Sequence, residues 1–113
     1  MEITTKDFSV SYNPDTGTVY CSGSLRLDGL EAYRPVQDVF NSATADTVCL
    51  AIDLSQLEFL NSSGISMLSM FVVGLRDRGD IQLILKGSSK ILWQTRSLKN
   101  LQRLMLSIEV ILE

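Results

Sequence analysis

The chain has 113 residues, of which 45% are hydrophobic and 20% are charged, and its net charge at pH 7 is −3. This length and composition predict a single domain, residues 1–113, with a substantial hydrophobic core. The negative net charge argues against non-specific nucleic-acid binding, which needs a basic surface. We interpret the basic residues from Arg76 onward as a solvated surface.

The sequence contains no histidine. It therefore lacks Ser–His and Cys–His nucleophilic pairs and the usual zinc ligands. Cys21 and Cys49 are isolated from each other in predicted strands, so we expect buried, reduced thiols. The alternative, a disulfide between them, is not decided by the sequence alone. Met1–Asp7 is polar, and no apolar run reaches about 20 residues. We therefore expect no signal peptide, no membrane insertion and a cytoplasmic location.

The N-terminal half begins with a predicted hairpin. Phe8–Tyr12 and residues 19–27 alternate apolar and polar residues, and Asn13–Gly17 between them is a dense turn signal. Pro35 suits the first turn of a helix whose apolar residues recur at i, i+3, i+4 and i+7. Thr47–Ile52 is almost wholly apolar, which is typical of a central strand covered on both sides.

The C-terminal half continues the alternation of strands and helices. The pattern predicts a helix that starts near Ser62 and ends at Arg78, followed by a strand over residues 81–85. A third helix, capped by Ser88 or Ser89, either continues to Met105 or breaks near Lys99-Asn100, and a strand over 108–112 follows it. The predicted order is β-β-α-β-α-β-α-β. It indicates an α/β fold with a mixed, mainly parallel sheet of four to five strands.

The most informative segment is Asn61–Gly64, with the sequence Asn-Ser-Ser-Gly, at the start of the hydrophobic helix. Backbone N–H groups at a helix N-terminus lack intrahelical partners and favour negative charge, so a serine there can receive a phosphate or cap the helix. Local chemistry alone favours a cap formed by Asn61 or Ser62, with Gly64 permitting close backbone approach. The lysine and spacing of a P-loop are absent.

The helix after this segment carries two apolar faces. One face holds regularly spaced core residues, whereas Met67, Met70 and Gly74 point the other way. A surface helix needs only one apolar stripe, and exposed methionine suits an adaptable protein–protein surface. The alternative is that another helix covers this second face.

The segment from Asp53 to Ile65 resembles the signature of STAS domains, the anti-sigma factor antagonist family. Those chains carry Asp-x-Ser, here Asp53 and Ser55, then a short apolar stretch with an aromatic residue, then Asp-Ser-Ser/Thr-Gly-Leu. Gly23-x-Leu25 resembles the Gly-x-Leu-Asp of the family. The predicted order of elements also matches the STAS-like fold.

The resemblance implies a non-enzymatic regulatory module that works by reversible protein–protein binding and needs no metal and no cofactor. A partner anti-sigma-type serine kinase would phosphorylate Ser62, with Ser63 as the second choice, and a phosphatase would restore binding. A phosphate adds about −1.5 to −2 charge, which must be desolvated against a partner, so phosphorylation would break the complex. The switch loop would contain Asp53, Ser55, Asn61 and Gly64, with Asp53 and Ser55 ordering it through hydrogen bonds to its backbone. The partner-binding face would include Met67, Met70 and Arg26.

The sequence departs from the family pattern in three places. Asn61 stands where the family usually has Asp, which keeps the cap but removes a negative charge beside Ser62. Arg26 stands where an acidic residue is expected, unless an insertion places Asp28 there. The last strand ends near Glu113 without the final helix of the family, so a homodimer or an obligate complex would cover the surface left behind.

Two alternatives to the phosphorylation switch follow from the sequence. Asn61 favours a constitutive STAS adaptor subunit of a larger signalling or transport assembly, without phosphorylation. An enzyme with Ser62 or Ser63 as nucleophile would need a lysine or a carboxylate as base, and none stands at a fixed spacing from them.

Overall fold

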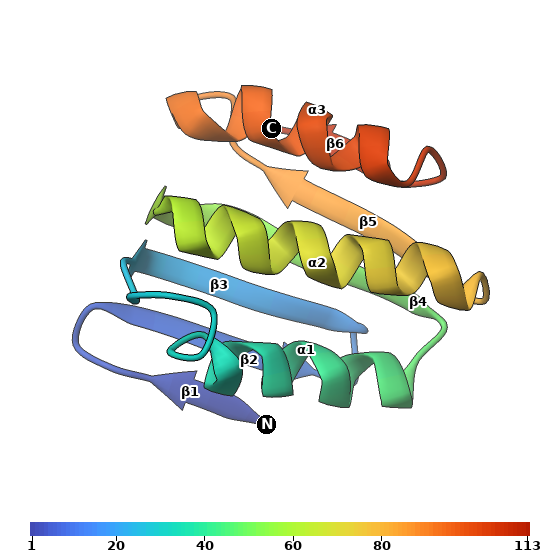
Figure 1. Cartoon of the computed structure of the whole chain (residues 1–113), viewed down its shortest axis with the longest axis horizontal. Coiled ribbons are helices and arrows are strands. Elements are labelled where there is room, and N and C mark those ends of the chain that lie inside the picture. Colours follow the sequence, from blue (N-terminus) through green and yellow to red (C-terminus); the bar gives the residue numbers. More distant parts are fainter.

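A computed structural model describes residues 1–113 of the protein as an alternation of six strands and three helices (Figure 1). The elements are β1 (Glu2–Thr4), β2 (Phe8–Asn13), β3 (Thr18–Leu25), α1 (Arg34–Asp46), β4 (Cys49–Leu60), α2 (Ser62–Arg78), β5 (Gln82–Gly87), α3 (Leu92–Leu104) and β6 (Glu109–Leu112). None of the helices combines the length and apolar character needed to cross a bilayer.

The six strands form one sheet in which their spatial order equals their order in the chain. β1, β2 and β3 pair antiparallel, whereas β3, β4, β5 and β6 pair parallel. The predicted α/β class and the mixed, mainly parallel sheet are confirmed. The predicted strand count was too low, because Met1–Asp7 lacks the apolar alternation that indicates a strand, yet Glu2–Thr4 pairs with β2 at the sheet edge.

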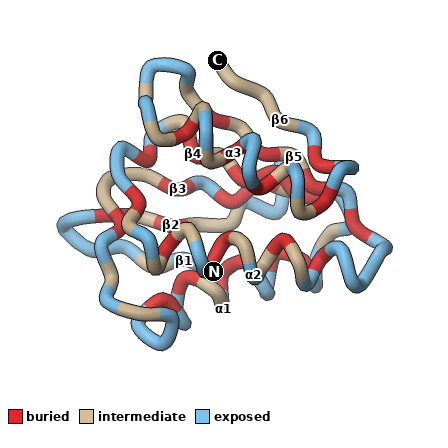
Figure 2. The backbone as a smooth tube through the Cα atoms, turned by 45° about the horizontal axis from the view of Figure 1, so that its top comes forward, coloured by how far each residue is buried: buried red, intermediate tan, exposed pale blue.

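All three helices lie on one face of the sheet (Figure 1). Each connection from β3 to β6 joins neighbouring parallel strands in the same direction, and such connections are right-handed, so each helix falls on the same side. The two-sided cover expected for residues 47–52 was therefore wrong. One hydrophobic core, with residues from all three helices, fills the space between the layers, and buried residues alternate with exposed ones along the elements (Figure 2).

Strand β4 is longer than predicted and contains the segment expected to be a loop. Asp53 and Ser55 lie inside this strand, so their assignment to a switch loop from the sequence was wrong. The register with β3 shifts between the pairs Tyr20–Asp53 and Ser22–Gln56, which places an extra residue in β4. This bulge bends the strand, and polar residues at the bend gave the segment its loop-like sequence.

Two side chains satisfy the backbone at the bend. The Asp53 carboxylate accepts hydrogen bonds from the backbone N–H and the hydroxyl of Ser55, at 2.9 and 2.6 Å. Gln94 of α3 is fully buried, and its Nε2 donates to the carbonyl oxygens of Leu54 and Leu57, at 2.5 and 2.9 Å. Pairing of β4 with β5 ends at Asp53, so Gln94 replaces a strand partner for carbonyls that would otherwise be buried without one.

The predicted helix boundaries are correct for α2 and wrong at the start of α3. Gly79 ends α2 in the left-handed conformation, with φ of 73°, and its N–H donates to the carbonyl of Leu75 at 3.0 Å. Helix α3 instead begins after Ile91, which makes no side-chain cap. The hydroxyl of Ser88 accepts from the N–H of Lys90 in the preceding turn, so the expected serine cap serves that turn and not the helix.

The two cysteines differ in exposure, and both are free. Cys21 of β3 is buried, as expected, whereas Cys49 at the start of β4 is exposed, contrary to expectation. Burial, together with the nearby charge of Asp53, raises the pKa of the Cys21 thiol to about 12. The thiolate form, which is the reactive one, is therefore rare at Cys21 near neutral pH.

We predict that iodoacetamide at pH 8 modifies one thiol of the folded protein, at Cys49, and two thiols of the protein in guanidinium chloride. Intact mass and peptide mapping measure both numbers. The Cys49→Ser variant is the control and should stay unmodified while folded. Labelling of Cys21 at the rate of Cys49 would contradict the burial described here.

Candidate functional site

The side chain of Asn61 joins three segments at the carboxyl ends of β3 and β4. Its Oδ1 accepts from the backbone N–H of Gly64 at 3.0 Å, which caps α2, and from the hydroxyl of Tyr33 at 2.6 Å. Its Nδ2 donates to the carbonyl of Leu27 at 2.8 Å. The loop between β3 and α1 is thereby fixed against the start of α2.

This geometry explains an amide at position 61. The N–H of Gly64 can only donate, so it faces Oδ1, and the NH₂ group then faces the carbonyl of Leu27. A carboxylate would cap the helix equally well but would put a second acceptor against that carbonyl. Burial raises the pKa of the Tyr33 phenol, which keeps it a neutral donor. The departure from the family pattern at Asn61 therefore has a structural role.

Gly64 is required by close packing inside α2. A Cβ atom added there would overlap the side chain of Leu60 and would lie 2.7 Å from the hydroxyl oxygen of Tyr33. The glycine thus lets Tyr33 reach Asn61 across the first turn of the helix. Asn61, Gly64 and Tyr33 form one packed unit, which we call the Asn61 hub.

The two serines beside the hub differ in environment. Ser62, the first residue of α2, is exposed, and its hydroxyl makes no hydrogen bond within the protein. The hydroxyl of Ser63 is half-buried and accepts from the backbone N–H of Gly29 at 3.3 Å. The cap is Asn61 and not Ser62, so the Ser62 hydroxyl is the one left free for another molecule.

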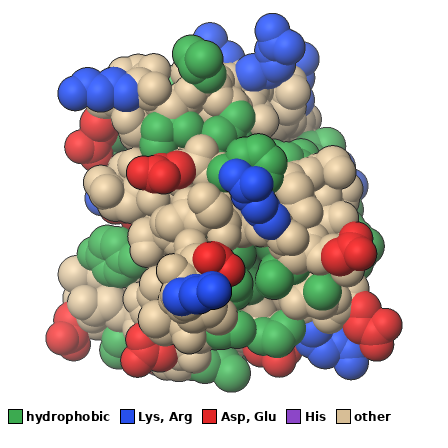
Figure 3. Space-filling model, turned by 90° about the vertical axis from the view of Figure 1, so that its left-hand side faces the viewer, with side chains coloured by type: hydrophobic (Ala, Val, Ile, Leu, Met, Phe, Trp, Pro, Cys, Tyr) green, Lys and Arg blue, Asp and Glu red, His purple; other side chains and the backbone are tan.

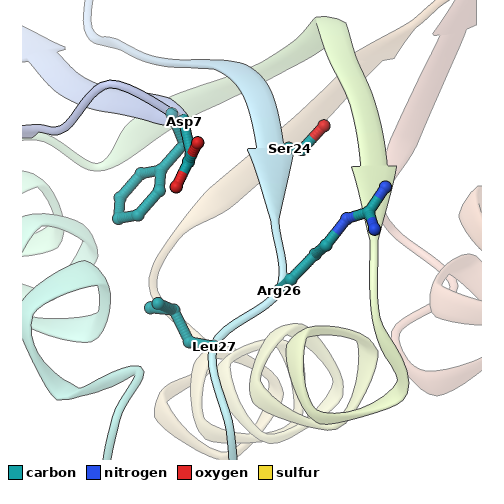
Figure 4. Close-up of a pocket in the computed structure, with 5 residues that line it drawn as sticks. Asp7, Ser24, Arg26 and Leu27 are labelled. Atoms are coloured by element: carbon teal, nitrogen blue, oxygen red, sulfur yellow. The ribbon is translucent and has the colours of Figure 1, made fainter.

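Arg26 lies at the same end of the sheet, directly after β3. Its guanidinium carbon lies 4.3 Å from the centroid of the Phe59 ring, a cation–π contact across the ends of β3 and β4. Figure 4 shows Arg26 extended toward the end of β4 from one side of a pocket. The residues that line this pocket are Asp7, Phe8, Ser24, Arg26 and Leu27.

Of the two methionines predicted for a partner face, only Met70 is accessible. Its exposed fraction is 58%, whereas that of Met67 is 1%. Helix α2 lies between α1 and α3, so its buried face is wider than a single stripe and takes in Met67 (Figure 1). The assignment of Met67 to the partner face was therefore wrong. The residues that remain outward at four-residue spacing are Ser62, Ser66, Met70 and Gly74, which we call the outer ridge of α2.

Tyr33, Trp93 and Gln94 position this end of the molecule, and sequence reasoning did not single them out. The indole N–H of Trp93 donates to the carbonyl of Glu58 at 3.0 Å and fastens α3 to the bent part of β4. No local pattern marks these residues, because each acts on a segment at least 28 positions away in the chain.

No protein-family model matches the sequence, and no curated protein matches it. Among solved structures, the chain is similar to a chain in the crystal structure of the diguanylate cyclase SiaD in complex with its activator SiaC from Pseudomonas aeruginosa. The TM-score is 0.72 at 15% sequence identity, and the match covers 100% of this chain and 99% of that chain. At this identity the similarity establishes the fold alone.

We predict that Asn61→Asp lowers the free energy of unfolding by about 1–3 kcal/mol at pH 7, because it removes the hydrogen bond to Leu27 and leaves two acceptors facing each other. Urea denaturation measures the change. Tyr33→Phe is the control, since it removes one neutral hydrogen bond to the hub and should cost about 0.5–1.5 kcal/mol. An Asn61→Asp protein as stable as the unchanged one would show that the amide is not needed.

Proposed function

We propose that this chain is a non-enzymatic regulatory module of the STAS type that binds a protein partner at the carboxyl end of the sheet. The contact surface would consist of Arg26, Phe59, the segment Asn61–Gly64 and the outer ridge of α2. The observation that carries this proposal is the exposed, unbonded hydroxyl of Ser62 at the first residue of a helix whose start is held rigidly by the Asn61 hub.

The similar solved structure supports a protein partner. It is a complex between an enzyme and its activator, and the chain that matches corresponds to the activator, SiaC. A regulatory module that acts by binding is consistent with the chemistry of this site. The hydroxyl of Ser62 makes no hydrogen bond with a lysine or carboxylate side chain, although nucleophilic activation would need such a base.

Phosphorylation of Ser62 would switch the module. An anti-sigma-type serine kinase in the cytoplasm would add the phosphate, and a phosphatase would remove it. The N-terminus of α2 tolerates the new charge, because the helix dipole favours anions there. A partner packed against the same helix start would have to desolvate about −1.5 to −2 charge, so its affinity would fall.

A constitutive adaptor is the second candidate function, and Asn61 is the observation that favours it. Both ends of its amide are used inside the domain, so no carboxylate is held next to Ser62. If a kinase needs that charge, the surface would bind its partner without a switch. The two functions share the contact surface and differ only in the phosphate.

We expect Ser62→Asp to weaken partner binding at least tenfold, because it places a charge at the centre of the contact. Cross-linking in extracts of the native host would identify the partner, and calorimetry with the purified partner would give the affinity. Ser107→Asp is the matched control, since Ser107 is an exposed serine in the turn before β6. Unchanged affinity of Ser62→Asp, or an equal loss for Ser107→Asp, would refute the assigned surface.

Protein purified from its native host should carry one phosphate, at Ser62, in part of the molecules. Intact mass followed by peptide mapping tests this expectation. The Ser62→Ala variant should lack the phosphate, and Ser63→Ala should keep it, because the Ser63 hydroxyl is engaged with Gly29. A phosphate at another residue would contradict the site, and its complete absence would leave the adaptor function.

A further inference from the structure

Helix α3 presents an exposed stripe of one leucine and three cations that the proposed function does not use. Its residues follow one another at spacings of three or four and are Leu92, Arg96, Lys99 and Arg103. Leu92 has an exposed fraction of 90%, the highest among the large hydrophobic residues of the chain. We call these four residues the basic stripe.

The stripe belongs to a marked separation of charge. Residues 81–108 contain five of the ten basic residues of the chain and no acidic residue, whereas residues 1–60 contain nine of the thirteen acidic ones. Figure 3 faces the end at which α2 and α3 begin, with basic side chains gathered near the top, toward α3, and most acidic ones in the lower half. A protein with a net charge of −3 thus carries a local basic surface.

The cations of the stripe have no partners of opposite charge within the protein. The two ion pairs of the structure, Arg76–Asp77 and Arg78–Asp80, lie at the end of α2 and in the turn after it. Like charges three and four residues apart repel one another along a helix, so the stripe does not stabilise α3. Lys90 and the uncapped N-terminus of α3 add positive potential at the end nearest Leu92.

Apolar surface accompanies these charges. Leu92 and the half-buried Trp93 lie beside the cations, and the hydrogen bond from Trp93 to Glu58 holds the indole in place. Together they line a shallow hollow on the outer side of α3. Its lining residues are Leu92, Trp93, Thr95, Arg96, Ser97 and Lys99.

We propose that the basic stripe docks an acidic segment of a partner protein, in which carboxylates flank one large apolar side chain that enters the hollow beside Leu92. This surface is distinct from the one at Ser62 and does not depend on phosphorylation. The charge complementarity favours an acidic occupant. A membrane is disfavoured, because the apolar face of α3, with Leu98 and Leu101, is buried in the core and only Leu92 is left to enter lipid.

A second copy of the chain fits less well. The acidic side of the molecule could face the stripe of a neighbour, but the contact would join two different surfaces. Such a contact closes only for particular rotations and otherwise propagates into filaments. A separate acidic protein avoids this problem.

Selection from random twelve-residue peptides displayed on phage, with the full chain immobilised, tests the proposal. We expect the selected peptides to be rich in Asp and Glu around one Leu, Ile, Phe or Trp. The double variant R96Q/K99Q should not enrich them. The matched control K6Q/R34Q also loses two positive charges, from exposed positions between β1 and β2 and at the first residue of α1, and should enrich them as the unchanged chain does.

The fluorescence of Trp93, the only tryptophan of the chain, can report the affinity of a selected peptide. Peptide binding should shift its fluorescence, and higher salt should weaken the binding. R96Q/K99Q and Leu92→Ala should each lose at least tenfold in affinity, whereas K6Q/R34Q and Ser62→Asp should change it less than twofold.

Four results would overturn the proposal. They are selected peptides without carboxylates, equal binding by R96Q/K99Q, tighter binding to phosphatidylserine vesicles than to any selected peptide, and salt-sensitive self-association that R96Q/K99Q abolishes. A tenfold loss in Ser62→Asp would be a fifth such result, because it would place the peptide at the Ser62 surface. Because Ser62→Asp is expected to change only the partner affinity, failure of the stripe and failure of the switch are separate results.

Discussion

The hydrogen bonds of the Asn61 side-chain amide hold together the end of the protein at which we propose the partner-binding surface. One acceptor atom holds the first turn of α2 and the hydroxyl of Tyr33, and one donor group holds the loop at Leu27. A carboxylate cannot do both, because it has no hydrogen to donate to the Leu27 carbonyl. The exposed Ser62 therefore follows a residue whose side chain makes three hydrogen bonds within the protein, to Gly64, Tyr33 and Leu27.

The order of the strands sets which surfaces are available. Because every connection after β3 moves one strand further in the same sense, α1, α2 and α3 form a single layer with α2 in the middle. The middle helix packs against the sheet and also against a helix on each side. Met67 is therefore part of the core, and the outer ridge of α2 stays accessible. Helix α3 has one helical neighbour, so more of its surface, including the basic stripe, faces outward.

The sequence was sufficient for the class of the fold, because periodicity records which side of an element is buried. It was insufficient for local structure that depends on a contact with a residue far away in the chain. The bend of β4 looked like a loop because the partner of its carbonyls is Gln94, about 40 positions away. Edge strand β1 has too few residues to show alternation. The spacing of residues around α2 did not reveal that the helix has a helical neighbour on each side. Asn61 was recognised as a cap, but its bonds to Leu27 and Tyr33 require the folded loop.

The two proposed surfaces act through different physics, although Trp93 and Glu58 join them at one end of the molecule. The surface at Ser62 is uncharged at its centre, so a phosphate there acts by desolvation within the contact and shortens the lifetime of the complex. The stripe carries permanent, hydrated charge, which steers an acidic partner toward the protein and loses strength as salt rises. A partner that touches both surfaces would therefore associate at a rate set by α3 and dissociate at a rate set by Ser62.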